Sequence, residues 1–336
     1  MQKETHPVNV LQRVRKIVAR QVEVETAKPF VVSVMGTTGT GKSSLINALF
    51  GTDLRTDPVR PCTKDVQTVR VDGSDGSHLL FHDLPGIGEA GTVDESYIAQ
   101  YRTRLLESDV VLWAIHADSR SVTFDQHALD RVLGDSPAER VALMSRLTFL
   151  LTKADLLTPA PWIFSKSGGV GMFAAMPATA ELLAEKERYF QDAFILPHAA
   201  DLVSSTHHDG TFDVSESGLA FDQHLVSHRG LLTSEAAEAL SARHPRHRDV
   251  FQRLHDNHRV ISCSARLRFN LANLMFVIVN KLGPGAAVRF QKFTSPQGLN
   301  TVSVETARRF CNLVVFDQAR GKVLFDMADQ ELGDRR

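Results

Sequence analysis

The sequence is poor in the features that mark secreted or highly charged proteins. It has three cysteines in 336 residues, Cys62, Cys263 and Cys311. An odd number of widely spaced cysteines argues against a disulfide framework and fits a reducing compartment. Lys plus Arg (38) nearly balance Asp plus Glu (39), so no overall charge directs the chain towards nucleic acid or an anionic membrane.

Long apolar runs are also missing. Residues 1–10 contain no apolar core of signal-peptide length. The most apolar run, 271–279, is nine residues long and includes Asn273, which is too short to span a bilayer. We therefore expect no transmembrane segment and a cytoplasmic location.

Strand and helix patterns alternate along most of the chain. Short β-branched or apolar runs predict strands at 29–35, 66–71, 79–82, 110–115, 147–151 and 260–263. Helical patterns lie between them, at 44–50, 96–106 and 125–133. This alternation is typical of an α/β fold with a mostly parallel sheet and helices on both faces.

Three segments depart from the alternation. Residues 10–22, in an N-terminal segment 1–28, carry apolar residues at helical spacing, and we expect this helix to pack on the following domain rather than on a membrane surface. Within the main domain, 29–282, a helix at 177–194 precedes a polar insertion, 197–258, that we expect to be partly ordered. A C-terminal tail, 283–336, has its best helix at 304–316.

A glycine-rich loop follows the first strand. Residues 36–43 read Gly-Thr-Thr-Gly-Thr-Gly-Lys-Ser, a pattern whose backbone N–H groups surround phosphates. Lys42 supplies a positive charge to the β- and γ-phosphates, and the Ser43 hydroxyl is a ligand for Mg²⁺. The predicted nucleotide-contacting residues are Gly36, Thr37, Thr38, Gly39, Thr40, Gly41, Lys42, Ser43 and Ser44.

A second magnesium ligand is expected at the end of a neighbouring strand. Asp83 closes the strand at 79–82 and opens Asp-Leu-Pro-Gly, in which Gly86 can direct its N–H at the γ-phosphate. Thr63, in the loop before it, is our choice for the switch threonine that completes Mg²⁺ coordination; Thr56 and Thr68 compete with it. We expect Lys42, Thr63 and Gly86 to act in catalysis.

A motif after the fifth predicted strand indicates which base the bound nucleotide carries. Thr152-Lys153-Ala154-Asp155 places a carboxylate where it can accept from N1–H and the 2-amino group of guanine. Adenine lacks both donors, which leaves the charge desolvated at a cost of roughly 1–3 kcal/mol. Ser264 and Ala265, one strand later, are expected to support this loop and to contact guanine O6. Taken alone, Asp155 could instead be the N-cap of a helix. A phosphate-loop protein that uses ATP is therefore an alternative to a guanine-specific one.

Taken together, these residues resemble the TRAFAC-class GTPases, most closely the Era-like branch named 50S-ribosome-binding GTPases. The similarity rests on 39–51, Pro-Cys-Thr at 61–63, Asp-Leu-Pro-Gly-Ile-Gly-Glu at 83–89 and Thr-Lys-Ala-Asp. It implies a P-loop NTPase G domain with a six-stranded sheet, one strand antiparallel. It also implies GTP hydrolysis to GDP with Mg²⁺ and a switch mechanism. Ribosome or RNA as effector follows from this analogy only.

The sequence departs from the family pattern at several positions. Thr152 stands where most members carry Asn, which implies modest nucleotide affinity, and Gly39 stands where potassium-activated members place Asn. Ile87 occupies the place of the water-orienting glutamine of Ras-like switches. An aliphatic side chain cannot orient water, so we expect slow intrinsic hydrolysis assisted by another group, a partner or a second copy.

Two further features leave alternatives open. A septin- or dynamin-like protein that self-associates with nucleotide also uses Thr-Lys-x-Asp, so a nucleotide-dependent homodimer is an alternative. Nine of the fourteen histidines lie between His198 and His258. His224 and His228 have the i,i+4 spacing of a helical metal site, but a solvated loop is the interpretation we prefer.

Overall fold

The computed structural model describes residues 29–54, 67–72, 78–84, 95–119, 122–157, 162–167, 170–208, 210–282, 296–307, 314–317 and 319–326. The helix predicted at 10–22 lies outside these ranges.

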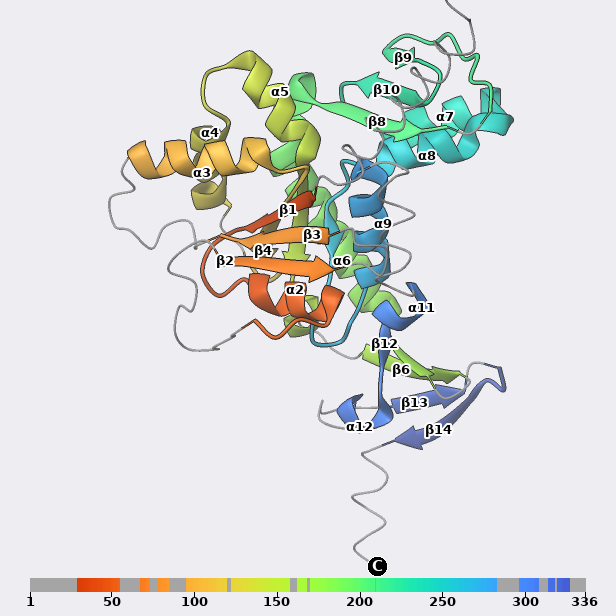
Figure 1. Cartoon of the computed structure of the whole chain (residues 1–336). Helices are drawn as coiled ribbons and strands as arrows, with labels where there is room; N and C mark the ends of the chain where they lie inside the picture. The colour runs from red at the N-terminus through yellow and green to blue at the C-terminus, as the bar shows by residue number, and fades with distance from the viewer. Residues whose placement is uncertain are drawn as a thin grey trace, which may run out of the picture.

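The central sheet has six strands in the order β11-β5-β4-β1-β3-β2 (Figure 1). β2 is antiparallel to β3, and the other four pairs are parallel. This confirms the predicted α/β sheet with one antiparallel strand. Its strands are β1 (Phe30–Met35), β2 (Gln67–Asp72), β3 (His78–Asp83), β4 (Val110–His116), β5 (Leu147–Thr152) and β11 (Ile261–Ser262).

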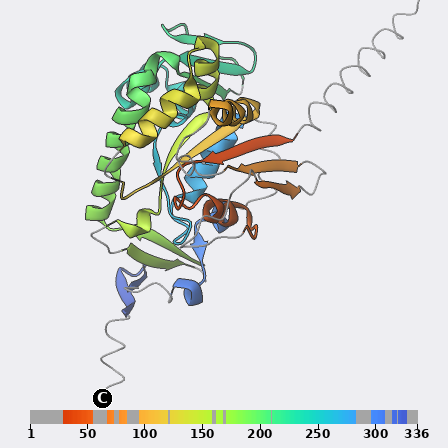
Figure 2. The same cartoon turned by 90° about the vertical axis from the view of Figure 1, so that its left-hand side faces the viewer.

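Alternate side chains of the central strands enter two separate cores. Val110 and Leu112 of β4 pack with residues of α2 (Lys42–Phe50) and α9 (Leu271–Leu282) on one face. Val111 and Trp113 pack on the opposite face, with residues of α3 (Glu95–Glu107), α4 (Thr123–Leu133) and α5 (Pro137–Arg146). A strand buried on both faces is largely apolar, and Figure 2 shows helices on either side of the sheet. The predicted three-layer arrangement is confirmed.

The predicted helix at 177–194 forms, although its end changes character. α6 (Pro177–Phe190) continues into a π-helical turn, η2 (Gln191–Ile195), and a 3₁₀ segment, η3 (Leu196–Asp201). Phe190 and Phe194 stack with their ring centroids 5.7 Å apart, and Phe194 also contacts Phe149 of β5. These aromatic contacts join the helical segment that precedes the insertion to the central sheet.

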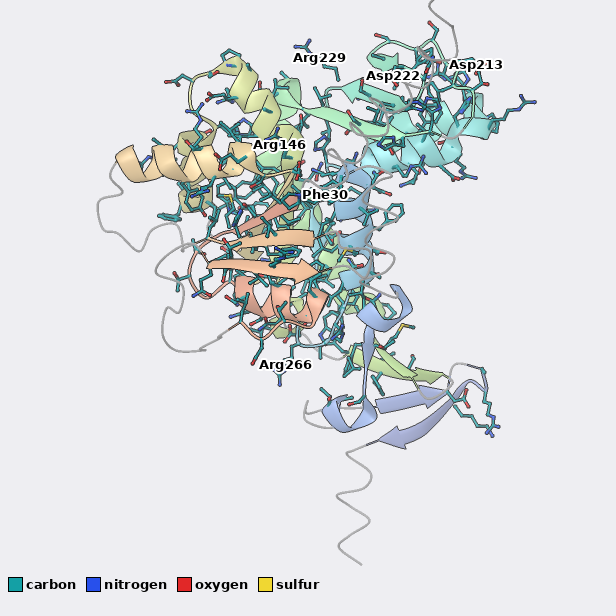
Figure 3. All side chains as sticks on the ribbon, viewed as in Figure 1. Phe30, Arg146, Asp213, Asp222, Arg229 and Arg266 are labelled. Atoms are coloured by element: carbon teal, nitrogen blue, oxygen red, sulfur yellow. The ribbon has the colours of Figure 1, made fainter. Side chains whose placement is uncertain are left out.

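The segment expected to be a partly ordered insertion is a regular module in its described part. β8 (Val203–His207), β10 (Leu225–Arg229) and β9 (Leu219–Phe221) form an antiparallel sheet. Two helices pack beside it, α7 (Ser234–Arg243) and α8 (Arg248–Asp256), joined by η4 (Pro245–His247). Phe212, Val226, Leu240 and Phe251 belong to its separate apolar core. Figure 3 labels Asp213, Asp222 and Arg229 on this module, far from Arg266 at the opposite end of the main domain.

Two histidines of the module do not fit the preferred solvated-loop interpretation, whereas the exposed His224 does. His208 and His258 are buried. His224 and His228 are not on a helix, because His228 lies in β10 and His224 precedes it. Among the described residues, no group of three or more His, Cys, Asp or Glu side chains is placed to hold a metal ion.

A second sheet joins the tail to a segment from the middle of the chain. Its strand order is β12-β7-β6-β13-β14, and it lies below the central sheet in Figure 1. The strands are β6 (Trp162–Ser167), β7 (Val170–Ala175), β12 (Thr301–Val302), β13 (Val314–Asp317) and β14 (Lys322–Asp326).

The helix predicted at 304–316 is confirmed at its start and wrong at its end, and 308–313 lie outside the described residues. α12 spans only Val304–Ala307, and β13 begins at Val314. A second short helix, α11 (Pro296–Leu299), precedes β12. Because β6 pairs with β13, the tail 283–336 shares a sheet with residues of the main domain. The domain boundaries themselves stay a prediction.

Candidate functional site

The glycine-rich loop lies between the carboxyl end of β1 and the start of α2. Gly36 (φ +139°) packs so closely on β4 that a Cβ atom there would lie 2.1 Å from the Ala114 backbone oxygen. Gly41 precedes α2 in the left-handed conformation (φ +88°), which a side chain would disfavour. The loop therefore presents the amino end of α2 to an anion, as phosphate binding requires.

The charged and hydroxyl groups of the loop point into it. The ammonium of Lys42 donates to the backbone oxygens of Gly36 and Thr37, each at 3.2 Å. Thr40 is buried, and its hydroxyl donates to the same Thr37 oxygen at 2.9 Å. A buried ammonium at a helix amino end is an arrangement that suits a polyphosphate.

Two of the three predicted magnesium ligands lie together. The Ser43 hydroxyl donates to Asp83 Oδ2 at 2.6 Å, although the residues are 40 positions apart. Asp83 ends β3, whose neighbour β1 leads into the loop, so the sheet itself brings the two oxygens to one edge. A hydroxyl and a carboxylate are hard oxygen donors of the kind that Mg²⁺ uses beside phosphates, so the residues present fit the ion.

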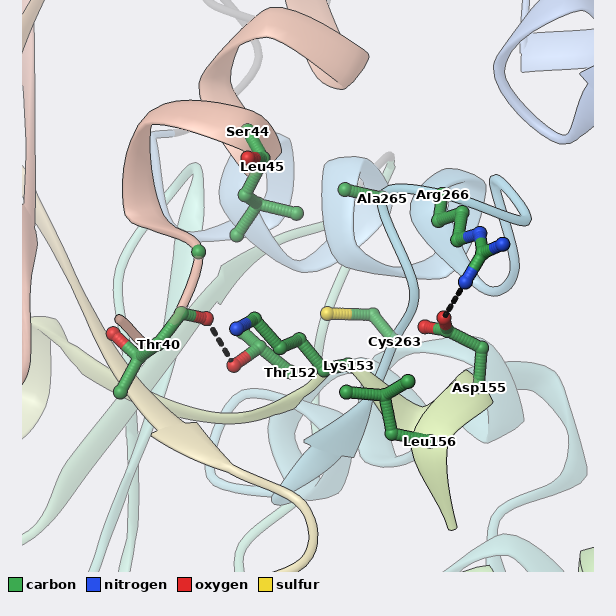
Figure 4. Close-up of a pocket in the computed structure, with 11 residues that line it drawn as sticks. Thr40, Ser44, Leu45, Thr152, Lys153, Asp155, Leu156, Cys263, Ala265 and Arg266 are labelled. Atoms are coloured by element: carbon green, nitrogen blue, oxygen red, sulfur yellow. Dashed lines mark hydrogen bonds and ion pairs between the residues drawn. The ribbon is translucent and has the colours of Figure 1, made fainter. Parts of the chain in front are cut away.

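A cavity of about 240 Å³ opens beside the loop. Its lining includes Gly41 from the loop, Ser44 from α2, and Lys153, Asp155 and Ala265 from the two predicted guanine motifs (Figure 4). These motifs follow β5 and β11, which are neighbouring parallel strands. Ligands bind at the carboxyl ends of such strands, and the volume admits a purine ring.

The acidic residue of the first motif is held by the second. Asp155 Oδ1 accepts a hydrogen bond from the Ser264 hydroxyl at 2.6 Å, as the predicted supporting role requires. Ser264 also accepts from the Leu267 backbone N–H, and its own backbone pairs with Phe269. Arg266 Nη1 lies 4.0 Å from Asp155 Oδ2. The carboxylate is therefore oriented towards the cavity by neighbours on two sides.

Thr152 ties the base motif to the phosphate loop. Its buried hydroxyl lies 2.6 Å from the Thr40 backbone oxygen and 3.0 Å from that of Ile115. One donor is thus shared between two carbonyls. Lys153 adopts a left-handed conformation (φ 55°), and its stem passes over Gly41, where an added Cβ would meet Lys153 Cε at 3.6 Å.

The structure also places His116, the last residue of β4, and Thr68, one of the two competitors of Thr63. His116 Nδ1 accepts from the Asp118 backbone N–H at 3.2 Å, and its pKa is lowered first by burial and then by Lys153, so it is a locally satisfied strand-end residue. Thr68 lies in β2 and contacts His82. Thr63, Gly86 and Ile87 lie outside the described residues, so their predicted roles stay predictions.

Two structural features of the site were not expected. Leu156 lines the cavity and is 47% exposed. The only indication of this in the sequence is that an apolar residue directly follows the acidic residue of the base motif. Arg268 donates to the backbone oxygens of Leu299 (2.8 Å) and Ala48 (3.0 Å). It joins the second base motif to α2 and to the C-terminal segment, and nothing local in the sequence indicates those partners.

A family model and several curated relatives each match part of this chain. Residues 31–145 match the family model described as 50S ribosome-binding GTPase. The uncharacterized protein YkfA of Escherichia coli (strain K12) is 36% identical over 149 residues, 44% of this chain and 50% of YkfA. GTPase Der of Streptococcus pneumoniae is 30% identical over 123 residues, 35% of this chain and 28% of Der.

The solved structures include Toc33 from Arabidopsis thaliana in complex with GDP and Mg²⁺. It aligns with 56% of this chain and 69% of its own, at 18% identity and a TM-score of 0.37. The chain spans about half the length of YkfA. In the described part of the chain, no helix has the length and apolar character needed to cross a membrane.

Proposed function

We propose that this chain binds GTP with Mg²⁺ and hydrolyses it to GDP and phosphate, because residues 31–145 match the family model described as 50S ribosome-binding GTPase. The observation that carries the proposal is the pairing of Asp155 with Ser264 at 2.6 Å beside the phosphate loop. It supports a fixed carboxylate for guanine within reach of a triphosphate site.

The phosphate end of the proposed site is formed by the loop and Asp83. The backbone of 36–41 and Lys42 would bind the phosphates, and Ser43 and Asp83 would hold Mg²⁺, which neutralises phosphate charge when bound. The 2.6 Å contact between their oxygens supports this assignment. Thr63 and Gly86 are proposed to complete the site in the triphosphate state.

The base preference is tested by titration with fluorescent GTP and ATP analogues in the presence of Mg²⁺. GTP should bind at least about tenfold more tightly, since adenine leaves the Asp155 carboxylate desolvated and unpaired. Asp155→Ala should remove the preference. Equal affinity of the unsubstituted protein for both nucleotides would contradict the proposal.

We further propose that intrinsic hydrolysis is slow, since Ile87 carries no group that orients water. The missing group would come from a switch residue, an effector or a second copy. Hydrolysis per molecule measured over a protein concentration series, together with sedimentation, separates these sources. A rate that rises with concentration as dimers form supports self-association, whereas fast hydrolysis by the dilute monomer contradicts the proposal. RNA or ribosome as effector rests on family analogy, and a net charge of −1 lends it no support.

A further inference from the structure

A second cavity lies on the outer side of β11, away from the nucleotide site. It has a volume of about 370 Å³, and its lining residues include members of α6, the end of α8, β11 and α9. We call it the edge groove. Val260, Ile261 and Val277 form its buried floor, and Glu187, Asn273 and Phe276 are among its polar and aromatic walls.

Side chains already form hydrogen bonds with the outer backbone groups at β11, the edge strand. Glu187 Oε1 accepts from the Ser262 N–H at 2.9 Å, and Gln191 Oε1 accepts from the Val260 N–H at 3.3 Å. Asn270 Nδ2 donates to the Ser262 oxygen at 2.9 Å. A partner strand therefore cannot extend the sheet here, and an occupant must be recognised through side-chain groups.

The groove carries an excess of negative charge. Glu187 and Asp256 face one cation, Arg259, whose Nη1 lies 3.4 Å from Asp256 Oδ1 while its side chain is 52% exposed. Such an open pair is weak. Glu187 uses only Oε1 in the bond to β11 and Asp256 only Oδ1, so within the described part of the chain one oxygen of each carboxylate is left to accept from a ligand.

An exposed aromatic ring completes the lining. Phe276 is 52% exposed although it lies on α9, whose neighbouring residue Val277 is buried. Carboxylate acceptors beside an aromatic face form a site for a cation that is planar, donates several hydrogen bonds and stacks, which describes a guanidinium group better than an ammonium.

We propose that the edge groove binds the guanidinium group of an arginine side chain presented by a partner protein. The apolar floor receives the methylene stem, Phe276 stacks on the guanidinium plane, and Glu187 and Asp256 accept its hydrogen bonds. Asn270 and Ser262 flank the loop that carries Ser264. A bound arginine side chain would therefore lie against the segment that also carries the second base motif. The proposal does not depend on nucleotide hydrolysis.

The test uses acetyl-arginine amide as the probe and the full chain labelled at its isoleucine δ1 methyl groups. The Ile261 signal is assigned with Ile261→Val. The probe should move this signal in a saturable way and leave Ile115, in the core beside the phosphate loop, unmoved. Acetyl-citrulline amide has the same shape without the charge, and should bind on the order of tenfold more weakly because it lacks charge-assisted hydrogen bonds.

Two variants and one control sharpen the result. Glu187→Gln keeps an acceptor for the Ser262 N–H while removing the charge, and should weaken the probe on the order of tenfold. Phe276→Leu should also weaken it, whereas Phe124→Leu, an equally exposed aromatic on α4 (50%), should not. An unmoved Ile261 signal at the highest soluble concentration, equal binding of the citrulline probe, or full binding by Glu187→Gln would each overturn the proposal.

Discussion

The hydroxyl of Thr152 lies 2.6 Å from the backbone oxygen of Thr40, so a single side chain connects the base motif with the phosphate loop. The same hydroxyl lies 3.0 Å from the Ile115 oxygen at the end of β4. An amide has two donor hydrogens and could serve each carbonyl separately, whereas a hydroxyl has one. Thr152 thus supplies the connection expected of this position with fewer donors.

We predict that Thr152→Val weakens GDP binding on the order of tenfold and lowers the free energy of unfolding by about 1–3 kcal/mol, because two buried carbonyls lose their donor. Thr148→Val is the matched control. Thr148 lies on the same strand, and its buried hydroxyl has no hydrogen-bond partner in the described part of the chain. The control should leave affinity unchanged. Equal affinities of the two variants, measured with fluorescent GDP, would show that the Thr152 bond contributes nothing.

Arg268 supports a second prediction, about the C-terminal segment. Its guanidinium bridges the Leu299 and Ala48 oxygens, and Asn300 Oδ1 accepts from the Ala272 N–H at the start of α9. Arg268→Met should remove two charge-assisted hydrogen bonds and lower the free energy of unfolding by about 1.5–3 kcal/mol. Hydrogen exchange at Val302 should become faster. Arg243→Met, which breaks an exposed pair with Glu216, should cost much less; similar losses in both would contradict this role.

Lys281 supports a third prediction, about pH. Its ammonium donates to the Ser145 and Leu147 backbone oxygens, and burial lowers its pKa to about 7. Below pH 7 the Lys281 side chain is protonated in both the folded and the unfolded chain. The full free-energy cost of burying its charge is then present. Between about pH 7 and the ordinary lysine value, the unfolded chain binds the proton that the folded chain has lost. The free energy of unfolding should therefore rise with pH, by at most about 1.4 kcal/mol per unit.

Urea unfolding of Lys281→Met, followed from pH 6 to 9, measures this contribution. The variant should lack the part of the slope that lies above pH 7. An unchanged slope would show that Lys281 keeps its proton through the carbonyl contacts.

Cys263 supports a fourth prediction, about chemical reactivity. Burial, with Asp155 and Glu187 nearby, raises its pKa to about 12, so at pH 8 only about one thiol in 10⁴ is ionised in the folded chain. In a Cys62→Ser/Cys311→Ser background, a thiol reagent should modify Cys263 at least about 100-fold more slowly than in urea. Rapid modification of the folded chain would mean that the base loop opens frequently.

The central sheet and the site could be predicted because their signals are local. Strands such as Phe30–Met35 are apolar except for one serine and end in motifs whose residue order is tied to phosphate chemistry. The parallel fold then brings Ser43 to Asp83 and Asp155 to Ser264 without further information.

The second sheet could not be predicted, because its pairing is not local. Phe164 in β6 pairs with Val315, far along the chain, and the short strand Val314–Asp317 leaves too few residues for a period to be recognised. The insertion was underestimated for a related reason. Its core residues, such as Phe212 and Val226, occur singly in a polar background, and only their packing shows that they belong together.

The most direct test of the central claim is the base preference of Asp155→Asn. The amide keeps an oxygen for the Ser264 hydroxyl and for N1–H, but it offers an N–H where guanine presents its 2-amino group and xanthine an oxygen. Affinities for GTP and XTP analogues are measured for both proteins by fluorescence titration. The account predicts that the unsubstituted protein prefers GTP and that Asp155→Asn prefers XTP. An unchanged preference for GTP in the variant would contradict the placement of guanine at Asp155.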